Sequence, residues 1–134
     1  MTLLVDTSVW SLAFRRDTPP DVPEVAALRR ALTGQDDVVT LGVIVLEVLR
    51  GFLPAPVGEA LAERLAWVPL LEPTRSDYVS AAGLSNVCRR SGVQLATIDS
   101  IIAQMAIAHD VTLLTTDRDF AYAAAHTPLR VWKP

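Results

Sequence analysis

The chain has 134 residues, of which 51% are hydrophobic, and a formal net charge of −3. This length and composition predict one domain with a single continuous core. An acidic chain is not a general polycation, so any attraction to nucleic acid must come from local basic patches and bound metal.

Other features of the sequence exclude further classes of protein. The single cysteine, Cys88, allows no internal disulfide and no cysteine-based zinc site, which suits a reducing cytoplasm. The first apolar run stops at Asp6, far short of the apolar region of a signal peptide. No run of about 18 uninterrupted apolar residues is present, which argues against a membrane span. We therefore expect a soluble, cytoplasmic protein.

Strand and helix signals alternate along the chain. The first half predicts a strand at 3–5, helices at 9–16 and 22–33, a strand at 38–40 and a helix at 42–50. The second half predicts a helix at 57–66, a strand at 67–71, helices at 75–90 (capped by Thr74) and 97–109, a strand at 111–115, a short helix at 120–125 and an edge strand at 129–132. Strands joined through helices form parallel sheets. The sequence thus predicts one α/β domain, 1–134, with a five-stranded parallel sheet flanked by helices on both faces.

Acidic residues end or interrupt apolar runs at Asp6, Glu47, Asp99 and Asp117. Burying an unpaired carboxylate is costly, so the repeated pattern suggests that these acids gather around a cation. Asp6 and Asp117 directly follow predicted strands, and ligands of parallel sheets bind beyond the carboxyl ends of the strands. A hard divalent cation is the obvious candidate because it prefers oxygen ligands.

Each of these acids also has an ordinary structural interpretation. Asp6 suits an N-cap or a turn, and Asp99 suits the first turn of a helix, where it would interact with the macrodipole. Glu47 can pair with Arg50 one turn later. The set as a whole, in its order and context, favours the metal site.

Segments along essentially the whole chain resemble a PIN domain, and specifically the VapC-type toxin ribonucleases. They are LLVDTSVW, GVIVLEVLRG, TIDSIIAQMAIAHDVTLLTTDRDF and LRVW. The resemblance implies a five-stranded parallel sheet with an acidic pocket that binds Mg²⁺ or Mn²⁺. It also implies metal-dependent endoribonuclease activity on RNA, a small antitoxin partner and a homodimer.

Carried over residue by residue, the resemblance implies a catalytic and metal-binding set of Asp6, Glu47, Asp99 and Asp117, with Asp6 and Asp99 as the principal ligands. Ser8 matches a small hydroxyl after the first acid, and Thr115 or Thr116 matches one before the last. Asp119 either assists Asp117 or lies outside the site, as an N-cap or first-turn residue of the next helix.

Substrate contacts are expected from arginines, because only Lys133 among the twelve basic residues is a lysine. A guanidinium grips phosphate with a bidentate fork and stacks on bases. The best candidates lie near an acid or at the end of an element: Arg15, Arg16, Arg50 and Arg118.

Apolar residues on the predicted helices suggest a partner surface. Those expected to be exposed are Trp10, Phe14, Leu53, Leu61 and Leu65, although Trp10 and Phe14 equally suit the core. The alternative function is a non-catalytic PIN-fold module that binds RNA or protein. Such a module should have lost at least one of the four acids, and this chain keeps them all.

Overall fold

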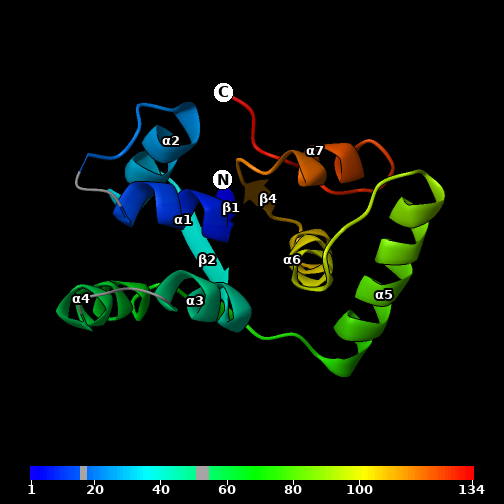
Figure 1. The fold of residues 1–134 in the computed structure, drawn as a ribbon, viewed down its shortest axis with the longest axis horizontal. Helices are drawn as coiled ribbons and strands as arrows, with labels where there is room; N and C mark the ends of the chain where they lie inside the picture. Colours follow the sequence, from blue (N-terminus) through cyan, green and yellow to red (C-terminus); the bar gives the residue numbers. More distant parts are fainter. Residues whose placement is uncertain (16–17, 51–54) are drawn as a thin grey trace.

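A parallel sheet lies at the centre of the fold (Figure 1). The computed structural model describes residues 1–15, 18–50 and 55–134. Within them the strands are β1 (Thr2–Val5), β2 (Asp37–Leu41), β3 (Leu70–Leu71) and β4 (Thr112–Leu114), in the spatial order β3-β2-β1-β4. β1 therefore lies inside the sheet between β2 and β4, and its register pairs Val5 with Leu114.

The predicted fifth strand at 129–132 is wrong for the part of the chain that the structure describes. Val131 makes only an isolated parallel bridge with Leu113. The Leu113 amide donates to the Arg130 carbonyl at 2.9 Å, and the Trp132 amide donates to the Leu113 carbonyl at 2.8 Å. Because β4 has only three residues, the segment beside it pairs at one position and does not form a ladder.

The helices pack on the two sides of the strands. Among the described residues they are α1 (Thr7–Phe14), α2 (Pro23–Leu32), α3 (Gly42–Leu49), α4 (Ala55–Leu65), α5 (Arg75–Arg90), α6 (Thr97–Ala108) and α7 (Arg118–Ala124). Figure 1 shows α1 and α2 on one side of the strands, and α6 on the other, with α5 on the outer side of α6. None of the helices in the described ranges is long and apolar enough to cross a lipid bilayer.

Local sequence explains where two elements begin. Thr74 caps α5 as predicted: its hydroxyl accepts from the Asp77 amide at 3.3 Å, and Asp77 accepts from the Thr74 amide at 2.8 Å. β3 begins later than predicted because Trp67 and Val68 still donate to the carbonyls of Arg64 and Leu65, in a turn that ends α4. The strand predicted at 67–71 is therefore reduced to Leu70–Leu71.

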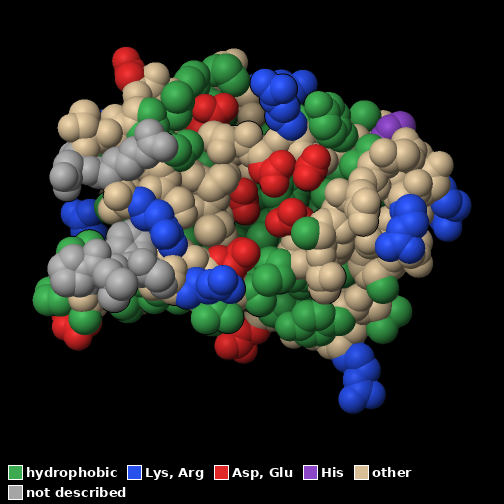
Figure 2. Space-filling view, in the orientation of Figure 1, with side chains coloured by type: hydrophobic (Ala, Val, Ile, Leu, Met, Phe, Trp, Pro, Cys, Tyr) green, Lys and Arg blue, Asp and Glu red, His purple; other side chains and the backbone are tan. Residues whose placement is uncertain are grey.

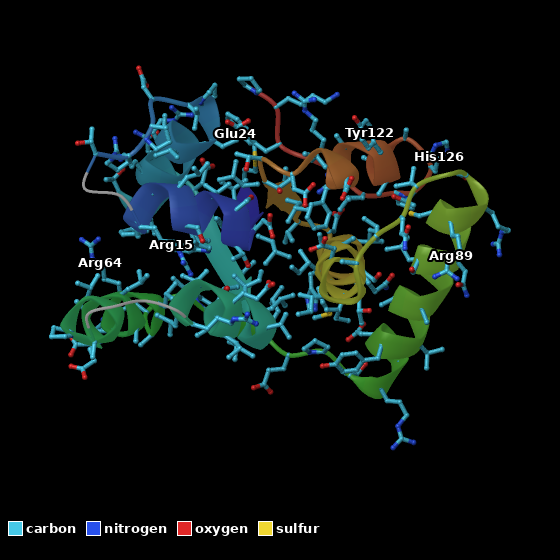
Figure 3. All side chains as sticks on the ribbon, in the orientation of Figure 1. Arg15, Glu24, Arg64, Arg89, Tyr122 and His126 are labelled. Carbon is cyan, nitrogen blue, oxygen red and sulfur yellow. The ribbon has the colours of Figure 1, made fainter. Side chains whose placement is uncertain are left out.

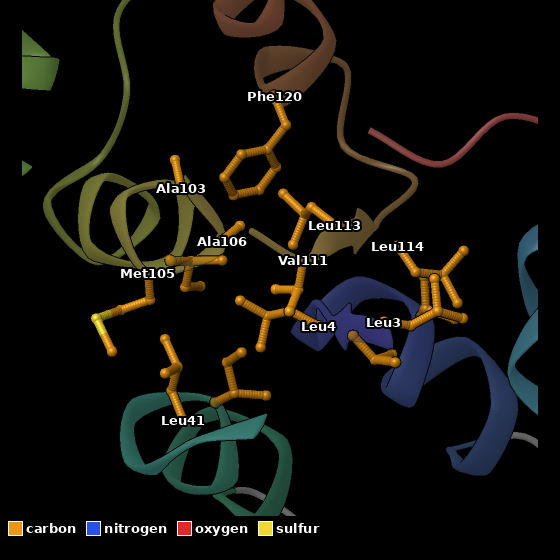
Figure 4. Close-up of a cluster of buried hydrophobic side chains, with 14 of the residues drawn as sticks. Leu3, Leu4, Leu41, Ala103, Met105, Ala106, Val111, Leu113, Leu114 and Phe120 are labelled. Carbon is orange, nitrogen blue, oxygen red and sulfur yellow. The ribbon is translucent and has the colours of Figure 1, made fainter. Parts of the chain in front are cut away.

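Apolar side chains from the strands and helices fill one core. β1 is its central strand, with Leu3, Leu4 and Val5 at most 1% exposed. Figure 4 shows Leu4, Leu41 and Met105 among the side chains that meet there. This packing follows from the position of β1, which is covered by neighbours on both edges and both faces.

The expectation that Trp10, Leu61 and Leu65 are exposed is wrong, since all three are at most 4% exposed. Trp10 stacks on Phe14 with ring centroids 5.8 Å apart, and the Arg64 guanidinium lies 5.5 Å from the centre of the Phe14 ring. Phe14 is partly buried against the core, and Leu53 lies outside the described residues. Trp10, Leu61 and Leu65 therefore hold α1 and α4 to the core instead of forming a partner surface.

Candidate active site

Asp6 is the buried centre of the candidate site. It immediately follows β1, and its amide donates to the Leu114 carbonyl at the end of β4 at 2.9 Å. Because β1 and β4 are parallel neighbours in register, Asp6 and Thr115 leave the sheet at the same edge. The residue is only 5% exposed, so its charge needs partners.

Two hydroxyl groups supply partners for the Asp6 carboxylate. Ser8 Oγ donates to Asp6 Oδ2 at 2.7 Å, and Thr115 Oγ1 donates to the same oxygen at 2.8 Å. Ser8 Oγ also accepts from the Thr116 amide at 3.2 Å. Of the two threonines left open by the sequence, Thr115 contacts the acid with its hydroxyl, and Thr116 contributes its backbone amide to Ser8. The hydroxyls fix the orientation of the carboxylate.

Glu47 reaches the site from α3 and is held by a residue that the sequence analysis missed. Thr7 Oγ1 donates to Glu47 Oε1 at 2.9 Å. The Glu47–Arg50 pair considered from the sequence is absent, because the only ion pairs within the described ranges are Met1–Asp36 and Arg130–Asp110. A hydroxyl residue next to the first acid was the available sequence signal for Thr7.

Asp99 lies in the first turn of α6, and the other acids affect the pKa of its carboxyl. The pKa of its carboxyl is raised from 3.8 to about 6, chiefly by burial and then by the charges of Asp6, Asp117, Glu47 and Asp119, in that order. The predicted acids are therefore close enough to interact electrostatically. Figure 2 shows acidic side chains gathered at the centre of one face.

Asp117 and Asp119 occupy the start of α7 in different roles. Asp117 is the N-cap, and its Oδ1 accepts from the Asp119 amide at 2.9 Å. The Asp117 amide in turn donates to Thr115 Oγ1 at 3.0 Å, which connects the cap to the Asp6 network. The N-cap role considered for Asp119 is wrong, and the first-turn role is confirmed.

The donor set suits a hydrated hard cation better than a cation fully enclosed by protein ligands. Within the described ranges, no three Asp, Glu, His or Cys side chains are placed to hold one ion together. Mg²⁺ usually keeps several waters and takes one or two carboxylates directly. Interacting carboxylates with one strongly raised pKa fit such an ion, because a cation would relieve their mutual repulsion.

The arginines proposed for substrate binding are placed differently from one another. Arg15 lies between α1 and α3 (Figure 3), where its Nη2 donates to the carbonyls of Val48 at 3.3 Å and Arg50 at 2.9 Å. Arg16 lies outside the described residues. Arg50 is exposed at the end of α3, and Arg118 is exposed at the start of α7, next to Asp117.

Comparison with known proteins agrees with this fold. The PIN domain family model matches residues 3–125. Ribonuclease VapC11 of Mycobacterium tuberculosis is 30% identical over 131 residues, which are 96% of this chain and 96% of the relative. The chain therefore belongs to the PIN domain family and, within it, to the VapC-type proteins.

Solved structures share the fold. VapBC2 from Rickettsia felis, bound to a DNA fragment from its promoter, has a TM-score of 0.77 at 17% identity, with 98% of each chain covered. FitAcB from Neisseria gonorrhoeae has a TM-score of 0.74 at 24% identity, with 98% of this chain and 96% of that chain covered. At these identities the likeness shows the architecture.

Proposed function

We propose that the protein is a metal-dependent endoribonuclease that hydrolyses RNA phosphodiester bonds in the cytoplasm, as the toxin of a type II toxin–antitoxin pair. The observation that carries the proposal is the gathering of Asp6, Glu47, Asp99 and Asp117 at one edge of the sheet, where burial and the carboxylates together raise the pKa of Asp99 to about 6. A cluster of this kind is unfavourable without a cation. The relative named Ribonuclease VapC11, similar over 96% of the chain, supports the choice of RNA as substrate.

Some residues of the site would bind Mg²⁺ or Mn²⁺ directly, and others would contact it through water. Asp6, with Oδ2 held by Ser8 and Thr115, and Asp99 would be the principal ligands. Glu47 and Asp117 would hold metal-bound water from opposite elements, α3 and the start of α7. When bound, the metal lowers the pKa of a water and neutralises charge on the phosphate.

Histidine has no place in this mechanism. His109 is the C-cap of α6, and His126 lies beyond the end of α7, where Figure 3 shows it away from the acidic centre. Neither histidine makes a side-chain hydrogen bond or ion pair with any described residue. Proton transfer would therefore fall to water and the carboxylates.

Cleavage of a labelled RNA with and without metal tests the proposal. We expect activity with Mg²⁺ or Mn²⁺, loss of activity in EDTA, and recovery when metal is restored. Asp6→Asn should abolish cleavage, whereas Asp21→Asn, the same change at an exposed residue before α2, should not. Undiminished cleavage in excess EDTA would overturn the mechanism.

A small antitoxin and a homodimer complete the proposal and follow from membership of the VapC type. Apolar side chains that the structure exposes give candidates for these contacts: Leu46, Trp67, Leu70, Tyr78 and Val79. Light scattering with and without the product of the neighbouring gene is the test. A strict monomer that the gene product does not stabilise would contradict this part.

A further inference from the structure

A hollow of about 750 Å³ opens beside the candidate active site, between α7 and the C-terminal segment. One end is formed by Thr115, Thr116 and Asp117. Thr115 is the residue whose hydroxyl donates to Asp6 at 2.8 Å. The hollow is thus continuous with the acidic centre and not a separate pocket.

The wall of the hollow carries three of the chain's twelve basic residues: Arg118, Arg130 and Lys133. The acids among its lining residues are Asp117 and Glu24, and Figure 3 shows Glu24 on α2 near the C-terminal segment. Figure 2 shows a basic patch directly above the acidic centre, over the region where Figure 1 places α7 and the C terminus. This lining is more basic than the chain as a whole, which has a net charge of −3, and its cations that have no partner among the described residues can attract a polyanion.

The three basic side chains differ in whether they already have partners within the protein. Arg130 donates to both the carboxylate and the carbonyl of Asp110, which fixes its guanidinium. Arg118 and Lys133 are exposed, and neither forms an ion pair or side-chain hydrogen bond with any described residue. Their charges remain available to a ligand.

Much of the remaining lining of the hollow is apolar. The apolar lining residues are Ala121 and Ala124 of α7, Ala125 directly after it, and Leu129, Val131 and the half-buried Trp132 of the last segment. A lining that combines cationic with apolar and aromatic side chains suits a nucleotide, whose phosphate is anionic and whose base presents flat apolar faces. Inorganic phosphate would use the cationic side chains alone.

We propose that this hollow binds the RNA strand next to the scissile bond, with Arg118 and Lys133 contacting a phosphate of the adjacent nucleotide. The inference rests on the proposed ribonuclease function and adds a place for the substrate outside the acidic centre. The acids repel the strand without metal, so a neighbouring basic wall provides the anchoring contact. Arg130 is ion-paired with Asp110, so the anchoring charge comes from Arg118 and Lys133.

Binding of a fluorescent single-stranded RNA tests the site. Anisotropy would be measured over a range of salt concentrations in the Asp6→Asn background, so that the RNA is not cut. Arg118→Gln, Lys133→Gln and the double variant are compared with Arg75→Gln. Arg75 is exposed at the start of α5, at the opposite end of the molecule in Figure 1, and its substitution removes the same charge.

Loss of the one phosphate contact that Arg118 and Lys133 share should reduce the slope of log affinity against log salt by about 0.7 in the double variant. Arg75→Gln should keep the parental slope. A double variant that matches Arg75→Gln in affinity and slope would overturn the proposal. A second result would also overturn it: millimolar inorganic phosphate competes with RNA in the parental protein but not in the double variant, while the two proteins bind RNA with equal affinity. That result would define a site for a small anion.

The inference can fail separately from the proposed function. Cleavage by the wild-type protein is measured in parallel, with and without EDTA. If the double variant and Arg75→Gln have the same salt slope while the wild-type protein shows metal-dependent cleavage, only the proposed role of the hollow is refuted. A clear binding difference in a protein that cleaves no RNA would instead remove the ribonuclease function and leave an RNA-binding site.

Discussion

Thr7 donates a hydrogen bond from Oγ1 to Oε1 of Glu47 at 2.9 Å, across 40 positions of sequence. Thr7 directly follows Asp6 and is the first residue of α1. The turn that brings Asp6 out of the sheet therefore also holds the acid of α3. Two of the proposed catalytic carboxylates are oriented by neighbours within one short segment, 6–8.

Thr7→Val should weaken the site through Glu47 while leaving the fold intact. A hydrogen bond to a charged group contributes roughly 1.5–3 kcal/mol, and a partial loss in the transition state would lower turnover about tenfold. Thr7→Ser keeps the hydroxyl and should retain most activity. Turnover and the metal concentration for half-maximal activity are measured for both variants. Equal values for the two variants would show that the contact does not support the site.

Substitutions of Asp117 and Asp119 should have different effects on activity and stability, because only Asp117 is the N-cap of α7. Asp117→Ala should abolish most cleavage and also cost roughly 0.5–2 kcal/mol of stability, because it removes the N-cap of α7. Asp117→Asn keeps a capping oxygen, so it should lose activity with little change in stability. Asp119→Ala should retain both for the most part. Urea midpoints and cleavage rates decide this, and a stable, inactive Asp119→Ala would reverse the assignment.

Asp6→Asn should raise the thermal stability of the metal-free protein. It removes a buried charge that repels Asp99, and its side-chain oxygen can still accept from Ser8 or Thr115. The melting temperature is measured in EDTA and again with Mg²⁺. We expect Mg²⁺ to stabilise the wild-type protein and to have little effect on the variant. A variant less stable in EDTA than the wild type would show that the hydroxyl bonds to the carboxylate outweigh the repulsion.

The sequence could predict the acids at strand ends because chain topology alone places them. Asp6 and Asp117 follow predicted strands, and parallel strands deliver such residues to one edge. It could not predict Thr7 as the partner of Glu47, since that contact depends on how α1 packs against α3. The sequence left both an N-cap and a first-turn role open for Asp119, and only the first-turn role holds because α7 begins two residues before the predicted start at 120.

The sequence also could not show which apolar residues of the helices are buried. Trp10, Leu61 and Leu65 were expected on a partner surface, but the structure turns all three inward. Periodicity shows that a helix has an apolar face and does not show whether the sheet or a partner covers it. The segment 129–132 has strand-like residues, yet a strand also needs a neighbour long enough to pair with, and β4 has only three residues.

Asp99 should make the stability of the metal-free protein fall as the pH rises. The pKa of its carboxyl in the folded protein is about 6, above the ordinary value of 3.8. Between these values the unfolded chain has lost the proton and the folded protein still holds it, so the folded state binds more protons and loses stability with rising pH. The contribution is fully present below about pH 4 and is lost as the pH rises through about 6. Since Asp99 is only half-buried, the change should be on the order of 1 kcal/mol.

Urea unfolding in EDTA at about pH 4, 5.5 and 7 measures this effect, and Asp99→Asn provides the control. The other carboxylates titrate in both proteins, so the difference between wild type and variant isolates Asp99. We expect the variant to gain on the wild type as the pH rises. Saturating Mg²⁺ should reduce the gap, because a bound cation stabilises the ionised carboxylate. Parallel pH profiles for the two proteins in EDTA would show that the Asp99 proton is not held by the acidic cluster.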